Sequence, residues 1–280
     1  MNTTRPRVAI AGSGLAGLHC AVQLASSADV TVYERLPVAG GEHWEDQDHA
    51  GLIREAKRQR VRFAPGTQVM RWEADRLLAV GEHGGVAAAD ALVIATGHRP
   101  PARAELRIDG DRCAGIVTAT LALHLLQQRV RLGANVIILG DSRWATECVE
   151  LMTAGRGTGT SVLWLGGSAA ISNPSVTVRQ NVRVTATHGM PRITGVTVED
   201  GESAEQITCD CLILAGPAVP YRNVDGAVLD DAPVVYAQRE VGSAEDPAQI
   251  GRRAANMALA QAKTQTHLRT RVAPRIGKPL

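Results

Sequence analysis

The pattern of apolar and polar positions in the first third of the chain predicts alternating strands and helices. Residues 7–35, "RVAIAGSGLAGLHCAVQLASSADVTVYER", read as strand, turn, helix and strand. The apolar run Val8 to Ala11 forms the first strand, and Glu34 closes the second. A β-rich stretch follows, and then an apolar strand at residues 89–97, "ADALVIATG". This alternation is typical of an α/β lobe with a parallel sheet.

The second half of the chain repeats this order. Residues 134–152, "ANVIILGDSRWATECVELM", give an apolar run, a glycine turn and a helical stretch. The strand "SVLWLGG" at 161–167, a β-rich stretch and the strand "CDCLILAGPAVP" at 209–220 follow. Such a duplication predicts two similar α/β lobes. A final apolar strand is expected near residues 232–242, "APVVYAQREVG", followed by an alanine-rich closing helix at 251–262.

The first turn carries a dinucleotide-binding motif. Gly12, Gly14 and Gly17 complete G-x-G-x-x-G between the first strand and the first helix. The first glycine permits the tight turn, the second lets a pyrophosphate approach the backbone, and the third lets helix and strand pack closely. Glu34, at the end of the next strand, is placed to accept hydrogen bonds from the hydroxyls of an adenosine ribose. The sequence therefore predicts an adenine dinucleotide in the first lobe.

Two later features favour FAD over NAD. A glycine pair, Gly40 and Gly41, follows Glu34, and the strand at 89–97 ends in Ala-Thr-Gly. This arrangement resembles the FAD half of the flavoproteins with two dinucleotide-binding domains, the pyridine nucleotide-disulfide oxidoreductase or thioredoxin reductase-like superfamily.

The resemblance implies a fold and a set of cofactor contacts. The fold is α/β, with two Rossmann-like three-layer lobes, the second inserted into the first, and a β-meander in each. It implies an FAD-binding domain at 1–112 and 233–280 and an inserted, degenerate NAD(P)-binding-like domain at 113–232. The implied FAD contacts are Gly12, Ser13, Gly14, Leu15, Ala16, Gly17, Glu34, Arg35, Gly41, Val69, Ala95, Thr96, Gly97 and Glu240.

One of these contacts departs from the family pattern. In that family the returning chain carries A-x-G-D, whose aspartate contacts the flavin ribityl chain. Here the matching residues are Ala237, Gln238, Arg239 and Glu240, so Glu240 takes the place of the aspartate and Arg239 that of the glycine.

The second lobe lacks the two features that select a nicotinamide cofactor, an acid for the ribose of NAD and an arginine cluster for the 2′-phosphate of NADP. The middle glycine is replaced by Ser142, and the following strand ends in Gly166 and Gly167, with neither an acid for a ribose nor an arginine cluster for a 2′-phosphate. NAD(P)H binding is therefore doubtful. A fold remnant and a site for another adenine nucleotide both remain open, the latter with Gly140, Ser142 and Arg143 as candidate contacts.

The connector before the second lobe has a further resemblance. Residues 104–126, with Gly115 to Ala119 inside them, look like the matching segment in the nucleotide-binding subunits of octopine oxidase, hydrogen cyanide synthase and sarcosine oxidase. That resemblance implies a protein partner within an amine or amino-acid dehydrogenase-type complex; a homo-oligomer is the alternative.

Cysteine usage and charge narrow the function classes. The chain has five cysteines and no C-x-x-C, which fits a reducing cytoplasm and argues against disulfide reduction by this chain alone. Cys209 and Cys211 are expected on one face of a strand, packed in the core. A net charge of +2 does not call for nucleic acid. No apolar run is long enough to span a membrane, and no metal cluster is expected.

Catalytic residues are not identified by any motif. His43 and His49 follow the glycine pair and are candidate acids or bases beside a flavin, although a solvated loop explains them as well. Three functions remain. The first is an FAD-dependent oxidoreductase that relays electrons between a reduced donor and a partner protein. The second is a stand-alone NAD(P)H-dependent flavin reductase. The third is a non-catalytic flavin-binding subunit with a structural or regulatory role.

Overall fold

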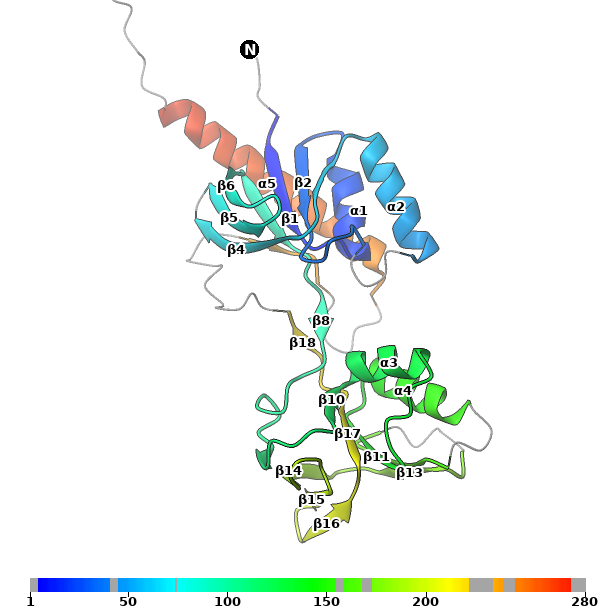
Figure 1. The fold of residues 1–280 in the computed structure, drawn as a ribbon. Helices are drawn as coiled ribbons and strands as arrows, with labels where there is room; N and C mark the ends of the chain where they lie inside the picture. The colour runs from blue at the N-terminus through cyan, green and yellow to red at the C-terminus, as the bar shows by residue number, and fades with distance from the viewer. Residues whose placement is uncertain are drawn as a thin grey trace, which may run out of the picture. The chain divides into compact units, whose positions relative to one another are not determined.

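The chain folds into two compact units. The computed structural model describes residues 5–40, 45–73, 75–154, 159–167, 173–221, 234–238 and 245–272, with side chains up to residue 266. The first unit comprises Met1–Gly97 and Pro220–Leu280, and the second comprises His98–Val219 (Figure 1). The borders expected from the sequence, 112/113 and 232/233, lie farther along the chain than these two crossings.

A five-stranded parallel sheet forms the centre of the first unit. Its strand order is β19-β7-β1-β2-β3. The strands are β1 (Arg7–Ala11), β2 (Asp29–Tyr33), β3 (Arg62–Ala64), β7 (Ala91–Ile94) and β19 (Val235–Tyr236). Because β19 lies beyond the second unit in the sequence and pairs with β7, the second unit is an insertion in the first. The expected return of the chain to its first lobe is therefore confirmed.

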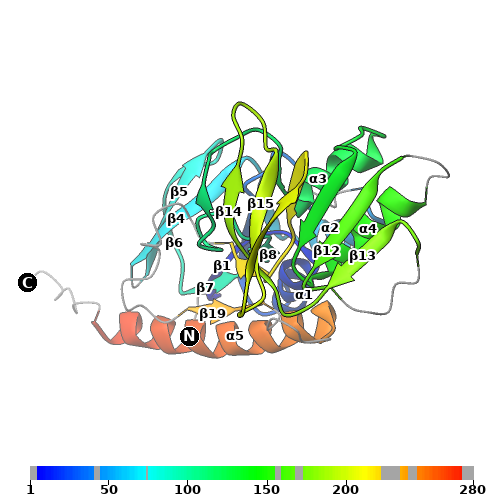
Figure 2. The ribbon, with the colours of Figure 1, turned by 90° about the horizontal axis from the view of Figure 1, so that it is seen from below.

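Two layers cover this sheet, one on each face. Helices α1 (Leu15–Leu24), α2 (Gln47–Arg58) and α5 (Pro247–Val272) lie on one face, and α5 runs along the sheet (Figure 2). The meander β4 (Thr67–Glu73), β5 (Arg76–Gly81) and β6 (Gly85–Ala88) packs on the other. The alternation of strand side chains decides this: Val8 and Ile10 of β1 face the helices, and Ala9 and Ala11 face the meander.

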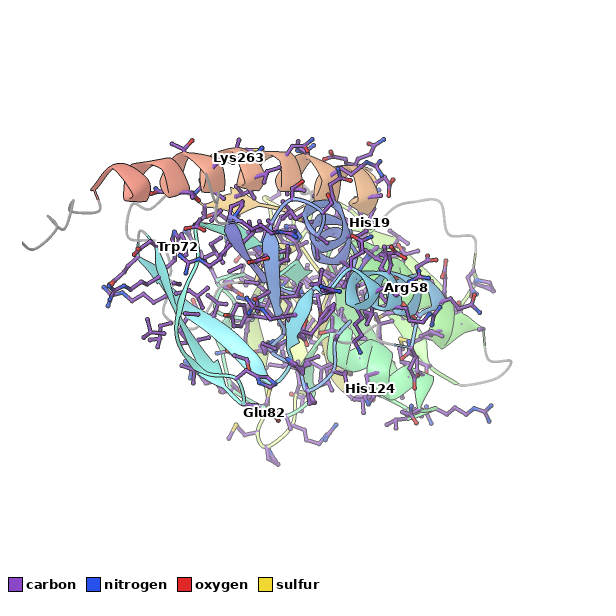
Figure 3. The ribbon with its side chains drawn as sticks, turned by 90° about the horizontal axis from the view of Figure 1, so that it is seen from above. His19, Arg58, Trp72, Glu82, His124 and Lys263 are labelled. Carbon is purple, nitrogen blue, oxygen red and sulfur yellow. The ribbon has the colours of Figure 1, made fainter. Side chains whose placement is uncertain are left out.

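Helices α1 and α5 approach closely because small residues line their contact. A Cβ added to Gly251 would lie 2.6 Å from the Ala16 carbonyl oxygen and 2.6 Å from the Cβ of His19. The alanines of α5 at 254, 255, 258 and 262 are all buried, as expected for the closing helix. Figure 3 shows His19 on α1 and Lys263 farther along α5. Burial lowers the pKa of His19, so its imidazole is held toward the neutral form.

The second unit has the same three-layer plan. Its parallel sheet has the order β10-β17-β11-β12-β13, with α3 (Ala119–Gln127) and α4 (Arg143–Thr153) on one face. The strands are β10 (Ile116–Thr118), β11 (Asn135–Leu139), β12 (Ser161–Leu165), β13 (Val176–Arg179) and β17 (Cys211–Leu214). A smaller sheet packs on the other face, made of β9 (Asp109–Gly110), β14 (Arg183–His188), β15 (Gly195–Glu199) and β16 (Ala204–Thr208).

The two units also share equivalent hydrogen bonds between an aspartate and the start of a strand. Asp90 stands just before β7 and accepts the Arg7 N–H at 2.7 Å at the start of β1. Asp210 stands just before β17 and accepts the N–H groups of Ala134 and Asn135 at 2.9 and 3.0 Å at the start of β11. The predicted fold class, two Rossmann-like lobes each with a β-meander, is confirmed.

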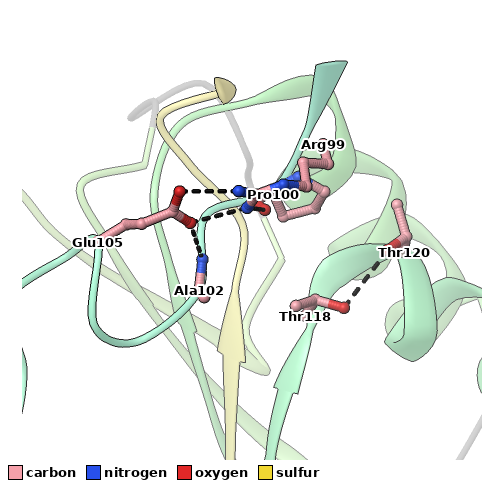
Figure 4. Close-up of polar contacts among 6 residues, drawn as sticks. All are labelled: Arg99, Pro100, Ala102, Glu105, Thr118 and Thr120. Atoms are coloured by element: carbon pink, nitrogen blue, oxygen red, sulfur yellow. Dashed lines mark hydrogen bonds and ion pairs between the residues drawn. The ribbon is translucent and has the colours of Figure 1, made fainter. Parts of the chain in front are cut away.

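The chain crosses between the units twice. The crossing segments β8 (His98–Arg99) and β18 (Val219–Pro220) pair as a two-stranded sheet. Just beyond the first crossing, the Arg99 guanidinium forms a two-pronged ion pair with Glu105, with N–O distances of 2.7 and 2.8 Å (Figure 4). The same Glu105 carboxylate accepts the Ala102 N–H at 2.7 Å, which fixes the start of this loop.

None of the helices described above is both long enough and apolar enough to cross a membrane.

Candidate functional site

Backbone crowding explains two glycines of the first turn. Gly12 has a φ of +106°, and a Cβ there would lie 2.4 Å from the carbonyl oxygen of Ala95. A Cβ on Gly17 would lie 2.3 Å from the carbonyl oxygen of Gly12. Side chains at either position would push β1, β7 and α1 apart. Both positions thus match the roles that the motif assigns to them.

Gly14 differs from these two because the space beside it is open. It is the N-cap of α1 in an extended conformation, and a Cβ there would meet no atom within 4 Å. No side chain caps the helix, and its first turn holds no acidic residue. The N-terminal amides of α1, beginning at Leu15 and Ala16, therefore have room for an anionic group such as a pyrophosphate.

Glu34 lies beside this turn, as expected for a ribose-binding acid. Its carboxylate is buried, and Oε2 accepts two hydrogen bonds from Ser13, from the hydroxyl at 2.6 Å and from the N–H at 3.1 Å. Oε1 accepts the Leu36 N–H at 2.9 Å. A carboxylate offers about four lone-pair sites. These donors occupy three of them, which leaves an acceptor site on Oε1 for one ribose hydroxyl.

Thr96 joins three segments at the carboxyl end of β7. Its hydroxyl donates to the Tyr221 carbonyl at 3.2 Å and accepts from the Gln238 amide at 3.2 Å. The Tyr221 N–H returns a hydrogen bond of 3.0 Å to the carbonyl oxygen of Gly97, which has a φ of +72°. The Ala-Thr-Gly end of the strand is thereby tied to the segment that follows β19.

Arg35 extends this cluster on the exposed side. Its guanidinium lies over the ring of Tyr221, with 5.1 Å between the Cζ atom and the ring centroid. Tyr221 and Gln238 are functional candidates that sequence reasoning missed. No motif marks Tyr221, and Gln238 occupies the variable position of the A-x-G-D pattern, so neither residue type carried a signal.

The remaining candidates of the first unit fall into two groups. Gly41, His43 and Glu240 lie outside the described residues, so their assignments stay predictions. Val69 is buried in the apolar layer between β4 and the main sheet. His49 is buried on α2 with its Nδ1 3.7 Å from the Asp46 carboxylate, so it belongs to a helix rather than to a solvated loop.

The second turn follows the first in backbone but differs in side chains. Gly140 has a φ of +117°, and a Cβ there would lie 2.5 Å from the Gly216 nitrogen. Ser142 is the N-cap of α4, and its hydroxyl donates to the Ala215 carbonyl. The guanidinium of Arg143 lies over the ring of its neighbour Trp144, which packs in the core with α3. The side chains of Ser142 and Arg143 therefore both make contacts within the second unit.

The cysteines are arranged differently from the expectation. Cys209 and Cys211 lie on opposite faces of the second sheet, because Cys209 packs with the small sheet and Cys211 with α3 and α4. The assignment of both to one face of a strand was wrong, since β17 begins only at Cys211 and Cys209 lies in the turn before it. All five cysteines are buried thiols. Burial raises the pKa of Cys20, Cys148, Cys209 and Cys211 to about 12.

Comparison with known proteins finds a family likeness in the first part of the chain. Residues 2–120 match the model of the pyridine nucleotide-disulphide oxidoreductase family. This match covers the glycine turn, Glu34 and the Ala-Thr-Gly strand, on which the resemblance was based. No curated protein matches the chain.

Solved structures extend the likeness to nearly the whole chain. Thioredoxin reductase of Lactococcus lactis has 14% identity and a TM-score of 0.66, with 94% of this chain and 99% of that one covered. The reduced CoADR-RHD protein of Bacillus anthracis has 14% identity and a TM-score of 0.63, with coverages of 92% and 57%. A 2-naphthoyl-CoA reductase in complex with 2-naphthoyl-CoA has 18% identity and a TM-score of 0.61, with coverages of 91% and 40%.

These likenesses bear on fold rather than on substrate. The chain spans about half the length of the last two proteins. Identities of 14–18% establish a shared fold alone. None of these three proteins is a dehydrogenase subunit of the octopine oxidase kind. The family match therefore describes residues 2–120, and the solved structures support the fold of two Rossmann lobes.

Proposed function

We propose that this chain is an FAD-dependent oxidoreductase that relays electrons between a reduced donor and a partner protein. The observation that carries the proposal is the pairing of the Gly14 turn with the Glu34 carboxylate. The turn offers amide donors and open space for a pyrophosphate, and the carboxylate offers one acceptor for a ribose hydroxyl. An adenine dinucleotide requires both groups side by side, the turn for its pyrophosphate and the acid for its ribose.

Different residues of the described structure would bind different parts of FAD. The start of α1 and Gly14 would hold the pyrophosphate, and Glu34 would hold the adenosine ribose. Arg35, next to Glu34, presents a cationic face at the surface of the same turn. When bound, the flavin supplies the redox chemistry, whereas the protein fixes its position and electrostatics.

Two features favour a protein partner over a redox-active dithiol within this chain. All five thiols are buried, and burial raises the pKa of four of them to about 12, which makes their thiolate forms far rarer than those of free cysteines. A buried, protonated thiol is a poor nucleophile, so electrons would leave the flavin by another route. The connector at 104–126 favours a subunit of an amine or amino-acid dehydrogenase-type complex. Free thiols also suit a reducing compartment such as the cytoplasm.

Two other functions compete with this one. A stand-alone NAD(P)H-dependent flavin reductase would need a working second turn, but Ser142 already bonds within its own unit and Gly166 carries no side chain. A non-catalytic flavin-binding subunit would keep the first turn and show no turnover with any donor.

The absorbance spectrum of the purified full chain tests the proposal directly. We expect flavin bands, release of FAD rather than FMN on denaturation, and slow or no bleaching by nicotinamide cofactors. Purification from the native source should bring down a partner protein, and addition of that partner with its substrate should bleach the flavin. Protein that cannot bind FAD after reconstitution would refute the proposal.

A further inference from the structure

Ser13 has an unusual set of contacts for a variable position of the glycine motif. Its side chain is fully buried, with 0% exposure. The hydroxyl donates to Glu34 Oε2 at 2.6 Å and accepts the Gly40 N–H at 2.8 Å. One oxygen atom therefore joins the phosphate turn, the acid at the end of β2 and the glycine pair that follows it.

The second unit provides an internal comparison. The Gly12 N–H donates to the Tyr33 carbonyl, and the Gly140 N–H donates in the same way to the Leu165 carbonyl. Gly14 and Ser142 are the matching helix N-caps. This register makes Ser13 equivalent to Asp141, and it makes Glu34 equivalent to Gly166.

Ser13 and Glu34 are therefore both replaced in the second unit, by Asp141 and Gly166. Where the acid at the strand end is absent, the serine of the turn is absent as well. Two carboxylates at these positions would repel each other, whereas a hydroxyl donor and a carboxylate stabilise each other. In this comparison the serine and the acid occur together, as a role of the serine toward the acid would require.

We propose that Ser13 is a positioning residue that holds the Glu34 carboxylate in the orientation that binds the adenosine ribose. The proposal rests on the proposed FAD site. By occupying Oε2 with two hydrogen bonds, Ser13 directs the carboxylate so that Oε1 keeps its free acceptor site. Loss of the hydroxyl leaves Oε2 with the N–H alone and releases the Gly40 N–H, so the carboxylate can rotate.

A double-mutant cycle on FAD affinity tests this role. The full chain is stripped of flavin and titrated with FAD as wild type, Ser13→Ala, Glu34→Ala and the double variant, with Ser26→Ala as the control on an exposed serine of the same unit. Because the Ser13 hydroxyl orients the carboxylate and does not itself bind the ribose, Ser13→Ala should weaken FAD less than Glu34→Ala does, by roughly two- to tenfold. In the Glu34→Ala background the same substitution should change affinity less than about twofold.

A second readout separates positioning from a general structural role. Competition against FAD is measured with ADP and with 2′,3′-dideoxy-ADP, which lacks the ribose hydroxyls. Ser13→Ala should lower the preference for ADP, whereas loosening of the turn would weaken both competitors equally. If Ser13→Ala does not fold by circular dichroism, Ser13→Gly removes the same hydroxyl and replaces it in the cycle.

The outcomes distinguish this inference from the proposed function. Wild type that fails to bind FAD refutes the FAD site itself. Wild type that binds FAD, with an equal loss on Ser13→Ala in both backgrounds or no loss in either, refutes the positioning role alone. An unchanged ADP preference also overturns it.

Discussion

The indole of Trp164 donates a hydrogen bond of 2.6 Å to the carbonyl oxygen of Gly140. This bond joins the end of strand β12 to Gly140, the first glycine of the turn before α4. Trp164 is 2% exposed, and a Cβ on Gly167 would lie 2.2 Å from its ring. The tryptophan is therefore fixed under the turn, and the turn keeps its shape by contacts within the protein.

Replacement of Trp164 by phenylalanine should destabilise the second unit. The Gly140 carbonyl loses its buried donor, which costs about 1–3 kcal/mol in addition to lost packing. Urea unfolding followed by circular dichroism measures the change. Trp72→Phe is the matched control, because the Trp72 Nε1 is buried and has no hydrogen-bond partner in the described structure. The control should cost less, and an equal loss for both would contradict the role of the Trp164 bond.

Gly14→Val and Gly17→Val should have different effects, the first on FAD binding and the second on folding. Gly14→Val adds its side chain in open space, so the protein should fold but lose FAD and its yellow colour. Gly17→Val places a side chain against the Gly12 carbonyl, so the protein should misfold or precipitate. Circular dichroism and the flavin absorbance together separate the two outcomes. A folded, fully yellow Gly14→Val protein would show that the pyrophosphate binds elsewhere.

Glu34→Ala should weaken FAD without unfolding the chain. A hydrogen bond to a charged partner contributes about 1.5–3 kcal/mol. On that scale the dissociation constant rises roughly ten- to a hundredfold. Equilibrium dialysis or fluorescence titration gives the value. Glu34→Gln keeps the shape and one carbonyl acceptor, so it should lie between wild type and alanine. Unchanged affinity in both variants would exclude the ribose assignment.

The cysteine thiols should react slowly with thiol reagents in the native protein. Burial raises the pKa of four cysteines to about 12, so these thiols stay protonated at pH 7–9 and react slowly with Ellman's reagent. All five should react after unfolding in guanidinium. Because the folded pKa lies above the unfolded value of 9.0, the folded state binds these protons more tightly. Stability contributed by these thiols is thus complete below pH 9 and falls as pH rises toward 12.

Neither NADH nor NADPH should reduce the bound flavin quickly. The Ser142 hydroxyl is committed to Ala215, and the equivalent of Glu34 is a glycine. Anaerobic stopped-flow mixing of the oxidised protein with millimolar cofactor measures the rate. Bleaching within roughly one second, the scale of ordinary enzyme turnover, would instead identify a nicotinamide-dependent flavin reductase.

The sequence predicted the first turn well because its geometry depends on glycines. Gly12 and Gly17 stand where any side chain would strike backbone, so local sequence alone reveals them. The duplication was also predictable, since buried parallel strands have the same apolar pattern in both units. The place of Glu34 beside the glycine turn was predictable because it is set by the length of one helix and one strand, whereas its binding of a ribose stays a prediction.

Contacts between residues far apart in the chain could not be predicted from the sequence. Thr96 and Gln238 lie 142 positions apart and meet only because β19 pairs with β7. The opposite facing of Cys209 and Cys211 was missed because the strand begins two residues later than its apolar pattern suggests. Strand boundaries depend on which neighbours supply hydrogen bonds, here Thr194 for Cys209 and Asn135 for Asp210.

The insertion of one unit into the other fixes an order of events during synthesis. The first unit needs β19 and α5 to complete its sheet and to cover α1, and both leave the ribosome after the second unit. The second unit is continuous from His98 to Val219 and has all its strands before then. A nascent chain therefore carries an unfinished first unit with an exposed apolar face, whereas the second unit has its described strands and can begin to fold. Truncations before residue 247 should accordingly yield a folded insert joined to an aggregation-prone first lobe.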